Sequence, residues 1–182
     1  MFGWLVSVLI VLLLAGCHAS YPGKANLLMK VPQVTTANAV EQSKAHIALA
    51  LLMIEQKNYS RAKDELFAAK ALSPKLPRLA YSFGYYYEQV GELTMAKRYY
   101  QQALKLAPDS PYVQNSYGAF LCRTGKPKQA IRYFLSAIRY PSFDEVALAY
   151  RNAGLCAEKS GNVALAKYYF NKARQHQTGA SS

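Results

Sequence analysis

The side chains best suited to chemistry in this sequence are three cysteines and three histidines. His18, His46 and His176 lie far apart along the chain. The sequence contains no His-Glu-x-x-His metal motif, no Gly-x-Ser-x-Gly elbow and no glycine-rich phosphate loop. We therefore expect no catalytic residue, no metal site and no cofactor other than a covalent lipid. The protein is predicted not to be an enzyme.

The lipid is expected on Cys17. This cysteine ends the run Leu13-Leu14-Ala15-Gly16-Cys17, which closes an almost wholly apolar stretch that starts at Phe2. The stretch is too short for a membrane-spanning helix and has the length of a signal-peptide core. The run resembles the bacterial lipobox, in which small residues admit the peptidase and the thiol receives the lipid. Residues 1–16 are then a lipoprotein signal peptide, and His18 after the cysteine implies sorting to the outer membrane.

Internal repetition organises the rest of the chain. Small residues recur at Ala50, Gly84, Gly118 and Gly154, with spacings of 34, 34 and 36 residues. A period of 34 residues is typical of the tetratricopeptide repeat, a helical hairpin. The two extra residues fall in the loop around Pro141-Ser142-Phe143-Asp144. We predict an all-α fold in which about four hairpins stack into a right-handed superhelix.

The repeat sets the expected boundaries. Gly91, Gly125 and Gly161 are expected to end first helices, and Pro111 and Pro127 to stand in first helical turns. We expect a flexible tether over 17–39, a tetratricopeptide domain over 40–176 and a tail over 177–182. The expected repeats cover about 43–76, 77–110, 111–146 and 147–176. The expected helices are 40–56, 60–72, 78–90, 93–106, 111–124, 127–139, 144–159 and 162–175.

Candidate partner-binding residues follow from the register of the repeat. In arrays of this kind, the first helix of each hairpin lines a concave groove. Tyrosines offer large, fairly rigid contact area together with a hydroxyl group. For Tyr81 and Tyr85, binding and core packing remain equal alternatives. The groove candidates are Tyr81, Tyr85, Glu88, Asn115, Arg123 and Arg151.

The first helix of the first repeat is apolar on almost every side, and it adds Ile47, Leu51 and Ile54 to the partner-binding candidates. An end repeat normally hides its apolar face. Either residues 25–36 fold back over this helix, or a partner covers it.

Cys122 and Cys156 form a second pair of candidate residues. They occupy the expected first helices of the third and fourth repeats, which stack as neighbours. An oxidising periplasm would allow these thiols to pair. A disulfide between them is a hypothesis that thiol titration can test.

Two further segments carry a resemblance to a known family. They are Asn-Ser-Tyr-Gly-Ala-Phe-Leu-Cys-Arg-Thr-Gly over 115–125 and Asn-Ala-Gly-Leu-Cys over 152–156. Together with the lipobox, they resemble the PilF/PilW family of type IV pilus biogenesis lipoproteins. The resemblance implies a pilotin at the periplasmic face of the outer membrane that binds the pilus secretin and promotes its localisation or multimerisation, and hence twitching motility. This chain has four repeats where well-known members have about six.

The chain carries an excess of positive charge. The formal net charge is +12, from 22 Lys and Arg against 10 Asp and Glu, without a basic run of five or six. We therefore expect no nucleic-acid partner. The chain is also expected to be a monomer. The alternative function is a tetratricopeptide lipoprotein scaffold for another envelope or cell-wall assembly complex.

Overall fold

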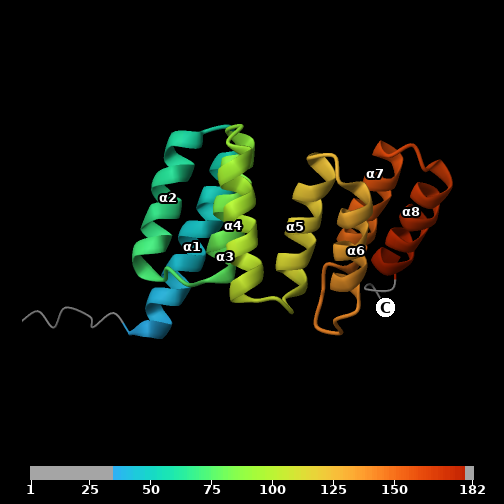
Figure 1. Cartoon of the computed structure of the whole chain (residues 1–182). Coiled ribbons are helices and arrows are strands. Elements are labelled where there is room, and N and C mark those ends of the chain that lie inside the picture. Colours follow the sequence, from blue (N-terminus) through green and yellow to red (C-terminus); the bar gives the residue numbers. More distant parts are fainter. Residues whose placement is uncertain (1–34, 179–182) are drawn as a thin grey trace, which may run out of the picture. The chain divides into compact units, whose positions relative to one another are not determined.

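The computed structural model of the chain describes residues 35–178 (Figure 1). These residues form eight α-helices and no β-strand. The fold is all-α, as predicted. The helices are α1 (Thr36–Glu55), α2 (Tyr59–Leu72), α3 (Pro77–Gln89), α4 (Leu93–Leu106), α5 (Pro111–Arg123), α6 (Pro127–Ile138), α7 (Val146–Lys159) and α8 (Val163–Thr178).

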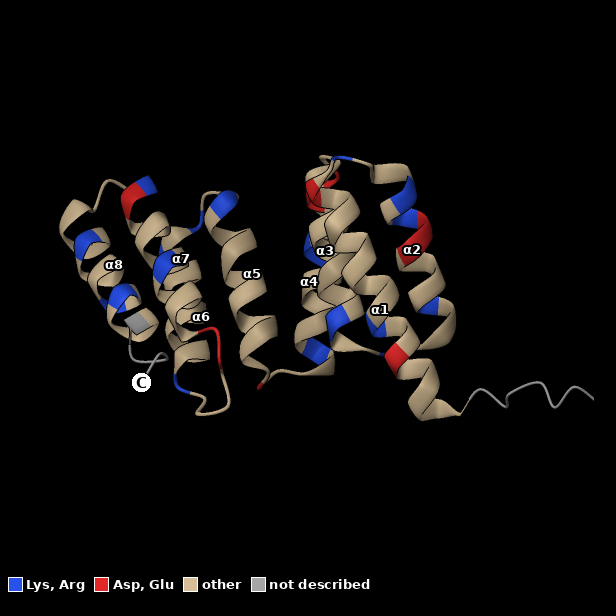
Figure 2. Ribbon diagram, turned by 180° about the vertical axis from the view of Figure 1, so that it is seen from behind, with Lys and Arg blue, Asp and Glu red and all other residues tan. Residues whose placement is uncertain are grey.

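Consecutive helices pair into four hairpins, α1 with α2, α3 with α4, α5 with α6, and α7 with α8. The first helices also contact one another in the order α1, α3, α5, α7. The second helices make no such contacts among the described residues, because each packs instead against the first helix that follows it. The molecule thus has a first-helix side and a second-helix side. Lys and Arg are distributed over the hairpins and do not gather on one helix (Figure 2).

The turn inside each hairpin needs one left-handed residue. Gly125 has φ +81° two residues after the end of α5, and Gly91 and Gly161 take the same conformation two residues after α3 and α7. Glycine adopts this region without the steric penalty of a Cβ atom. In the first hairpin Lys57 fills the equivalent place with φ 59°. The predicted helix ends at the three glycines are confirmed.

Close approach of the two helices in a hairpin depends on the recurring small residue. A Cβ atom on Gly118 would lie 2.8 Å from the Phe134 ring, and one on Gly154 would lie 2.6 Å from the Phe170 ring. In the first hairpin Ala50 and Leu66, both fully buried, occupy these positions. The helices of the first hairpin therefore approach each other with alanine in place of glycine and with leucine in place of the aromatic residue.

Two main groups of buried residues form the core. One contains residues of α1, α2 and α3, among them Ile47, Leu66 and Phe83. The other runs from α4 to α8 and includes Tyr100 and Phe134. Between them lies a small cluster of Ala80, Ala103 and Val113.

Some boundaries differ from those expected. Helix α1 begins at Thr36 and not at 40, because the Thr35 hydroxyl accepts a hydrogen bond from the Asn38 amide at 3.2 Å and caps the helix. Helix α7 begins at Val146 and not at 144, because Phe143 is buried in the preceding loop, 5.3 Å from the Tyr112 ring. Helix α8 continues to Thr178. The predicted signal peptide, Cys17, the segment 25–34 and most of the tether lie outside the described residues.

Candidate functional site

The first-helix side contains a pocket, the first-helix pocket, of about 220 Å³. It is built mainly by α1, α3 and α5, with one aromatic ring from α4. The three first helices bring together residues more than 60 positions apart in sequence, from Leu51 to Arg123. Its lining residues are Leu51, Tyr81, Tyr85, Tyr100, Asn115, Ser116, Ala119 and Arg123.

Arg123, one of the residues that line this pocket, forms an ion pair with Glu88. The Glu88 side chain is only 7% exposed, and Arg123 donates to it through Nε and through Nη2, the latter at 2.8 Å from Oε2. The Tyr100 hydroxyl also donates to Glu88 Oε2, at 3.2 Å. A buried carboxylate needs such partners, because desolvation strongly disfavours an unpaired charge. The pair ties α3 to α5.

Tyr85 joins this network from the other side. Its hydroxyl donates to Glu55 Oε1 at 2.8 Å, and the Arg123 guanidinium lies 6.0 Å from its ring centroid. Burial first, and the hydrogen bond to Glu55 second, raise the pKa of Tyr85 to about 12. Burial also raises the pKa of Tyr81 and of Tyr100. The three hydroxyls are therefore neutral hydrogen-bonding groups at neutral pH.

The groove side continues on α7. Asn152 Nδ2 donates to Asn115 Oδ1 at 3.2 Å, which links α7 to α5. Arg151 and Leu155 are both exposed on α7, Leu155 to 47%. The first-helix side thus presents amide groups, the paired guanidinium of Arg123 and the apolar surface of Leu155. This combination is suited to a polypeptide ligand, which offers backbone polar groups and apolar side chains together.

Cys122 and Cys156, the two cysteines considered for a disulfide, are bonded in the structure with their Cα atoms 5.6 Å apart. The bond joins α5 to α7. Next to it, Lys159 Nζ donates to the backbone oxygen of Arg123 at 3.1 Å. The disulfide therefore fixes the spacing of the third and fourth hairpins directly beside the Glu88–Arg123 pair.

The predicted partner-binding residues divide into three groups. Tyr81, Tyr85, Asn115, Arg123 and Leu51 line the first-helix pocket. Glu88 pairs with Arg123, and Arg151 lies on the neighbouring α7. Ile47 and Ile54, which were predicted to bind a partner, are 0% and 3% exposed and pack in the core. A partner cannot reach these two side chains in this structure. They lie on the side of α1 that the second and third helices cover, while Leu49 and Leu52 are exposed.

Glu55, Ser116 and Tyr100 belong to the site and were not predicted. Tyr100 also packs in the core, since it is 2% exposed. One signal in the sequence distinguishes it: the equivalent residues of the next two repeats are Phe134 and Phe170. A hydroxyl at a buried position requires a partner, and that partner is Glu88.

The described residues contain no cluster of three or more His, Cys, Asp or Glu side chains that could hold a metal ion. Within residues 35–178, no helix has both the length and the apolar character needed to cross a membrane.

Two tetratricopeptide repeat family models match the chain, one over residues 77–110 and the other over 121–180. The chain belongs to the tetratricopeptide repeat proteins, whose fold is of the scaffold type.

Among solved structures, the chain is similar to PilF of Pseudomonas aeruginosa, with 25% identity and a TM-score of 0.68 over 76% of this chain. It is also similar to PilW, described as a widely conserved type IV pilus biogenesis factor, with 28% identity and a TM-score of 0.67 over 74% of this chain. In each case the chain spans 62% of the length of that protein. The tetratricopeptide repeat protein YrrB shares the fold, with 21% identity and a TM-score of 0.56 over 79% of this chain and 75% of YrrB. A comparison with curated proteins finds no match.

Proposed function

We propose that this chain is a lipid-anchored adaptor of type IV pilus assembly that binds a secretin subunit through its first-helix pocket. The observation that carries the proposal is the pocket itself, in which α3 offers two tyrosines, α5 offers an amide and a guanidinium group, and α1 offers the apolar Leu51. The fold similarity to PilF and to the pilus biogenesis factor PilW supports the choice of pathway. No catalytic role is proposed.

The sequence around Cys17 supports the anchor and the location. The run Leu13-Leu14-Ala15-Gly16-Cys17 provides the small residues and the thiol that lipidation requires. With the lipid in the periplasmic face of the outer membrane, the hairpins would meet a secretin subunit as it arrives at that membrane.

The test is a clean deletion of the gene followed by complementation. The deletion is expected to abolish pili and to deplete heat-stable secretin multimers in outer-membrane fractions. Complementation with Cys17→Ala should leave the protein unanchored and the multimers depleted. Normal multimers in the deletion strain would contradict the proposal and favour a scaffold for another envelope complex.

Point variants separate the pocket from the fold. Tyr85→Ala removes a ring and a hydroxyl from the pocket, while Tyr168→Ala removes an exposed tyrosine from α8. Crosslinking pull-downs from membranes should recover less secretin with Tyr85→Ala and an unchanged amount with Tyr168→Ala. Equal recovery with both variants, at equal protein levels, would assign binding to another surface.

A further inference from the structure

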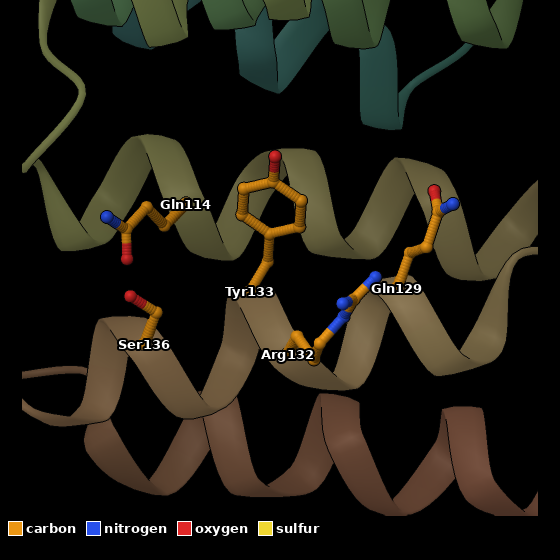
Figure 3. Close-up of a pocket in the computed structure, with 5 residues that line it drawn as sticks. All are labelled: Gln114, Gln129, Arg132, Tyr133 and Ser136. Carbon is orange, nitrogen blue, oxygen red and sulfur yellow. The ribbon is translucent and has the colours of Figure 1, made fainter.

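A second pocket lies on the opposite, second-helix side of the third hairpin. This second-helix groove has a volume of about 490 Å³ and is lined by Gln114 of α5 and by Gln129, Arg132, Tyr133 and Ser136 of α6 (Figure 3). Its volume exceeds the roughly 30 Å³ of one water molecule and falls within the roughly 300–1,000 Å³ of ligand pockets. None of its residues belongs to the first-helix pocket.

The groove contains a buried acceptor without a partner. Gln114 is only 7% exposed, and its Oε1 atom makes no hydrogen bond within the described residues. The orientation of the amide is fixed, because Gln114 Nε2 donates to the Pro108 carbonyl oxygen at 2.8 Å and that oxygen can only accept. Figure 3 shows the amide oxygen turned toward the Ser136 hydroxyl across the groove. A buried carbonyl oxygen is normally paired with a donor, and a ligand that enters the groove would supply one.

The charges around the groove have one sign. Gln129 also lines an adjoining hollow of about 350 Å³ with Lys126 and Lys128. Lys126, Lys128 and Arg132 form no ion pair with any residue in the range 35–178, and neither pocket is lined by an acidic residue. The surface therefore favours a ligand with negative charge.

The repeat supplies an internal comparison. Moving the four α6 positions back by 34 residues gives Met95, Arg98, Tyr99 and Gln102, which line a similar pocket of about 270 Å³ on α4. The arginine–tyrosine pair is thus repeated on successive second helices. The position equivalent to Gln114 is Ala80, so of these two pockets only the one on the third hairpin combines the arginine with the buried amide.

We propose that the second-helix groove of the third hairpin binds an extended acidic peptide segment. A backbone N–H of that segment donates to Gln114 Oε1, and its carboxylates pair with Arg132 and the neighbouring lysines. A fully deprotonated anion such as sulfate would satisfy the cations but has no donor for Gln114, whereas a peptide supplies both groups. The distance from Lys126, which precedes α6, to Ser136 in that helix is about 15 Å, which four or five extended residues would span. This site is independent of the secretin-binding role proposed above.

The test uses the full chain, purified in detergent and labelled with ¹⁵N, and a blocked heptapeptide, acetyl-Gly-Ser-Glu-Gly-Glu-Ser-Gly-amide. Titration is expected to shift the Gln114 side-chain amide signals and the backbone signals of α6. Replacing both glutamates by glutamine should weaken binding about tenfold or more. Replacing all seven residues by their N-methyl forms, which removes the backbone N–H donor of each residue, should weaken binding and leave the Gln114 signals unmoved.

Matched variants complete the test. Arg132→Gln should weaken peptide binding about tenfold, whereas Arg98→Gln, at the equivalent position without the amide, should leave it nearly unchanged. Gln114→Leu should abolish the preference for the peptide over its N-methylated form, and Tyr85→Ala in the first-helix pocket should have no effect. The proposal is overturned if Gln114 does not respond at millimolar peptide, or if inorganic phosphate or single-stranded DNA shifts the same signals as strongly.

Discussion

At the scale of single residues, the first-helix pocket depends on one carboxylate. The Glu88 side chain is almost completely buried, and it comes from the same helix as the partly buried pocket tyrosines Tyr81 and Tyr85. Its negative charge is matched by Arg123 from the next hairpin and by the Tyr100 hydroxyl. The positions of Tyr85 and Arg123 in the pocket are therefore coupled to the stability of the fold.

Replacing Arg123 by a neutral residue tests this coupling. Arg123→Leu is expected to lower the free energy of unfolding by about 2–3 kcal/mol, because Glu88 would remain buried without its ion pair, and the partial exposure of Arg123 reduces the effect below that of a fully buried pair. Urea denaturation at neutral pH measures the change. Adding Glu88→Gln to this variant should recover part of the loss. A loss no greater than that of Arg98→Leu, an exposed arginine without an ion pair among the described residues, would contradict the prediction.

The tyrosine hydroxyls give the protein a pH dependence in the alkaline range. Tyr85 has a pKa of about 12 in the folded protein, against an ordinary value of 10.0. Between these values the folded state binds more protons than the unfolded state, so the free energy of unfolding falls as the pH rises from 10 toward 12. The decline should be smaller for Tyr85→Phe. Urea midpoints measured on both sides of pH 10 test this, and identical slopes for the two proteins would refute it.

At the scale of the helix pair, the contact between glycine and an aromatic ring controls how closely the helices approach. Gly118→Ala is expected to lower the free energy of unfolding by about 1–3 kcal/mol, because the new Cβ atom would overlap the Phe134 ring. The double variant with Phe134→Leu recreates the Ala50–Leu66 pair of the first hairpin.

A double-mutant cycle over Gly118 and Phe134 measures this compensation by urea denaturation. We expect a favourable coupling free energy of about 1 kcal/mol or more, since the smaller leucine makes room for the alanine. If the two single effects simply add, the contact does not limit the approach of the helices.

The helices themselves were largely predictable from sequence, because their signals are local. The 34-residue period, Pro111 and Pro127 in first turns, and glycines after first helices each depend on a few neighbouring residues. The exceptions also have local causes, namely the Thr35 cap and the buried Phe143.

The pocket was predictable only in part. Register placed Tyr81, Tyr85, Asn115 and Arg123 on the first-helix side, where they lie. It could not separate Ile47 and Ile54 from Leu51, because burial on α1 depends on how α2 and α3 cover it. The Glu88–Arg123 pair joins residues 35 positions apart, and its geometry is a property of the stacked hairpins.

At the scale of the whole molecule, the disulfide acts on one end of the array. Reduction of Cys122–Cys156, or Cys122→Ser with Cys156→Ser, is expected to lower the free energy of unfolding by about 2–4 kcal/mol. Hydrogen exchange should become faster in α7 and α8 and change little in α1 and α2, because repeat arrays transmit stability mainly between neighbours. Uniform loss of protection in all four hairpins would contradict this prediction.

The division of the core has a consequence for how such a chain can be recombined. The two main groups of buried residues meet inside the second hairpin, because Leu79 and Phe83 of α3 group with α1 and α2, while Tyr100 of α4 groups with α5 to α8. A crossover between genes in the Gly91 turn would keep these two groups apart, but it would divide the hairpin in which Gly84 of α3 packs against the Tyr100 ring. A crossover before Pro77 would keep that hairpin whole and would join α3 to an α1 and α2 from the other parent. Either exchange is therefore expected to succeed only between parents that share the residues packed against α3.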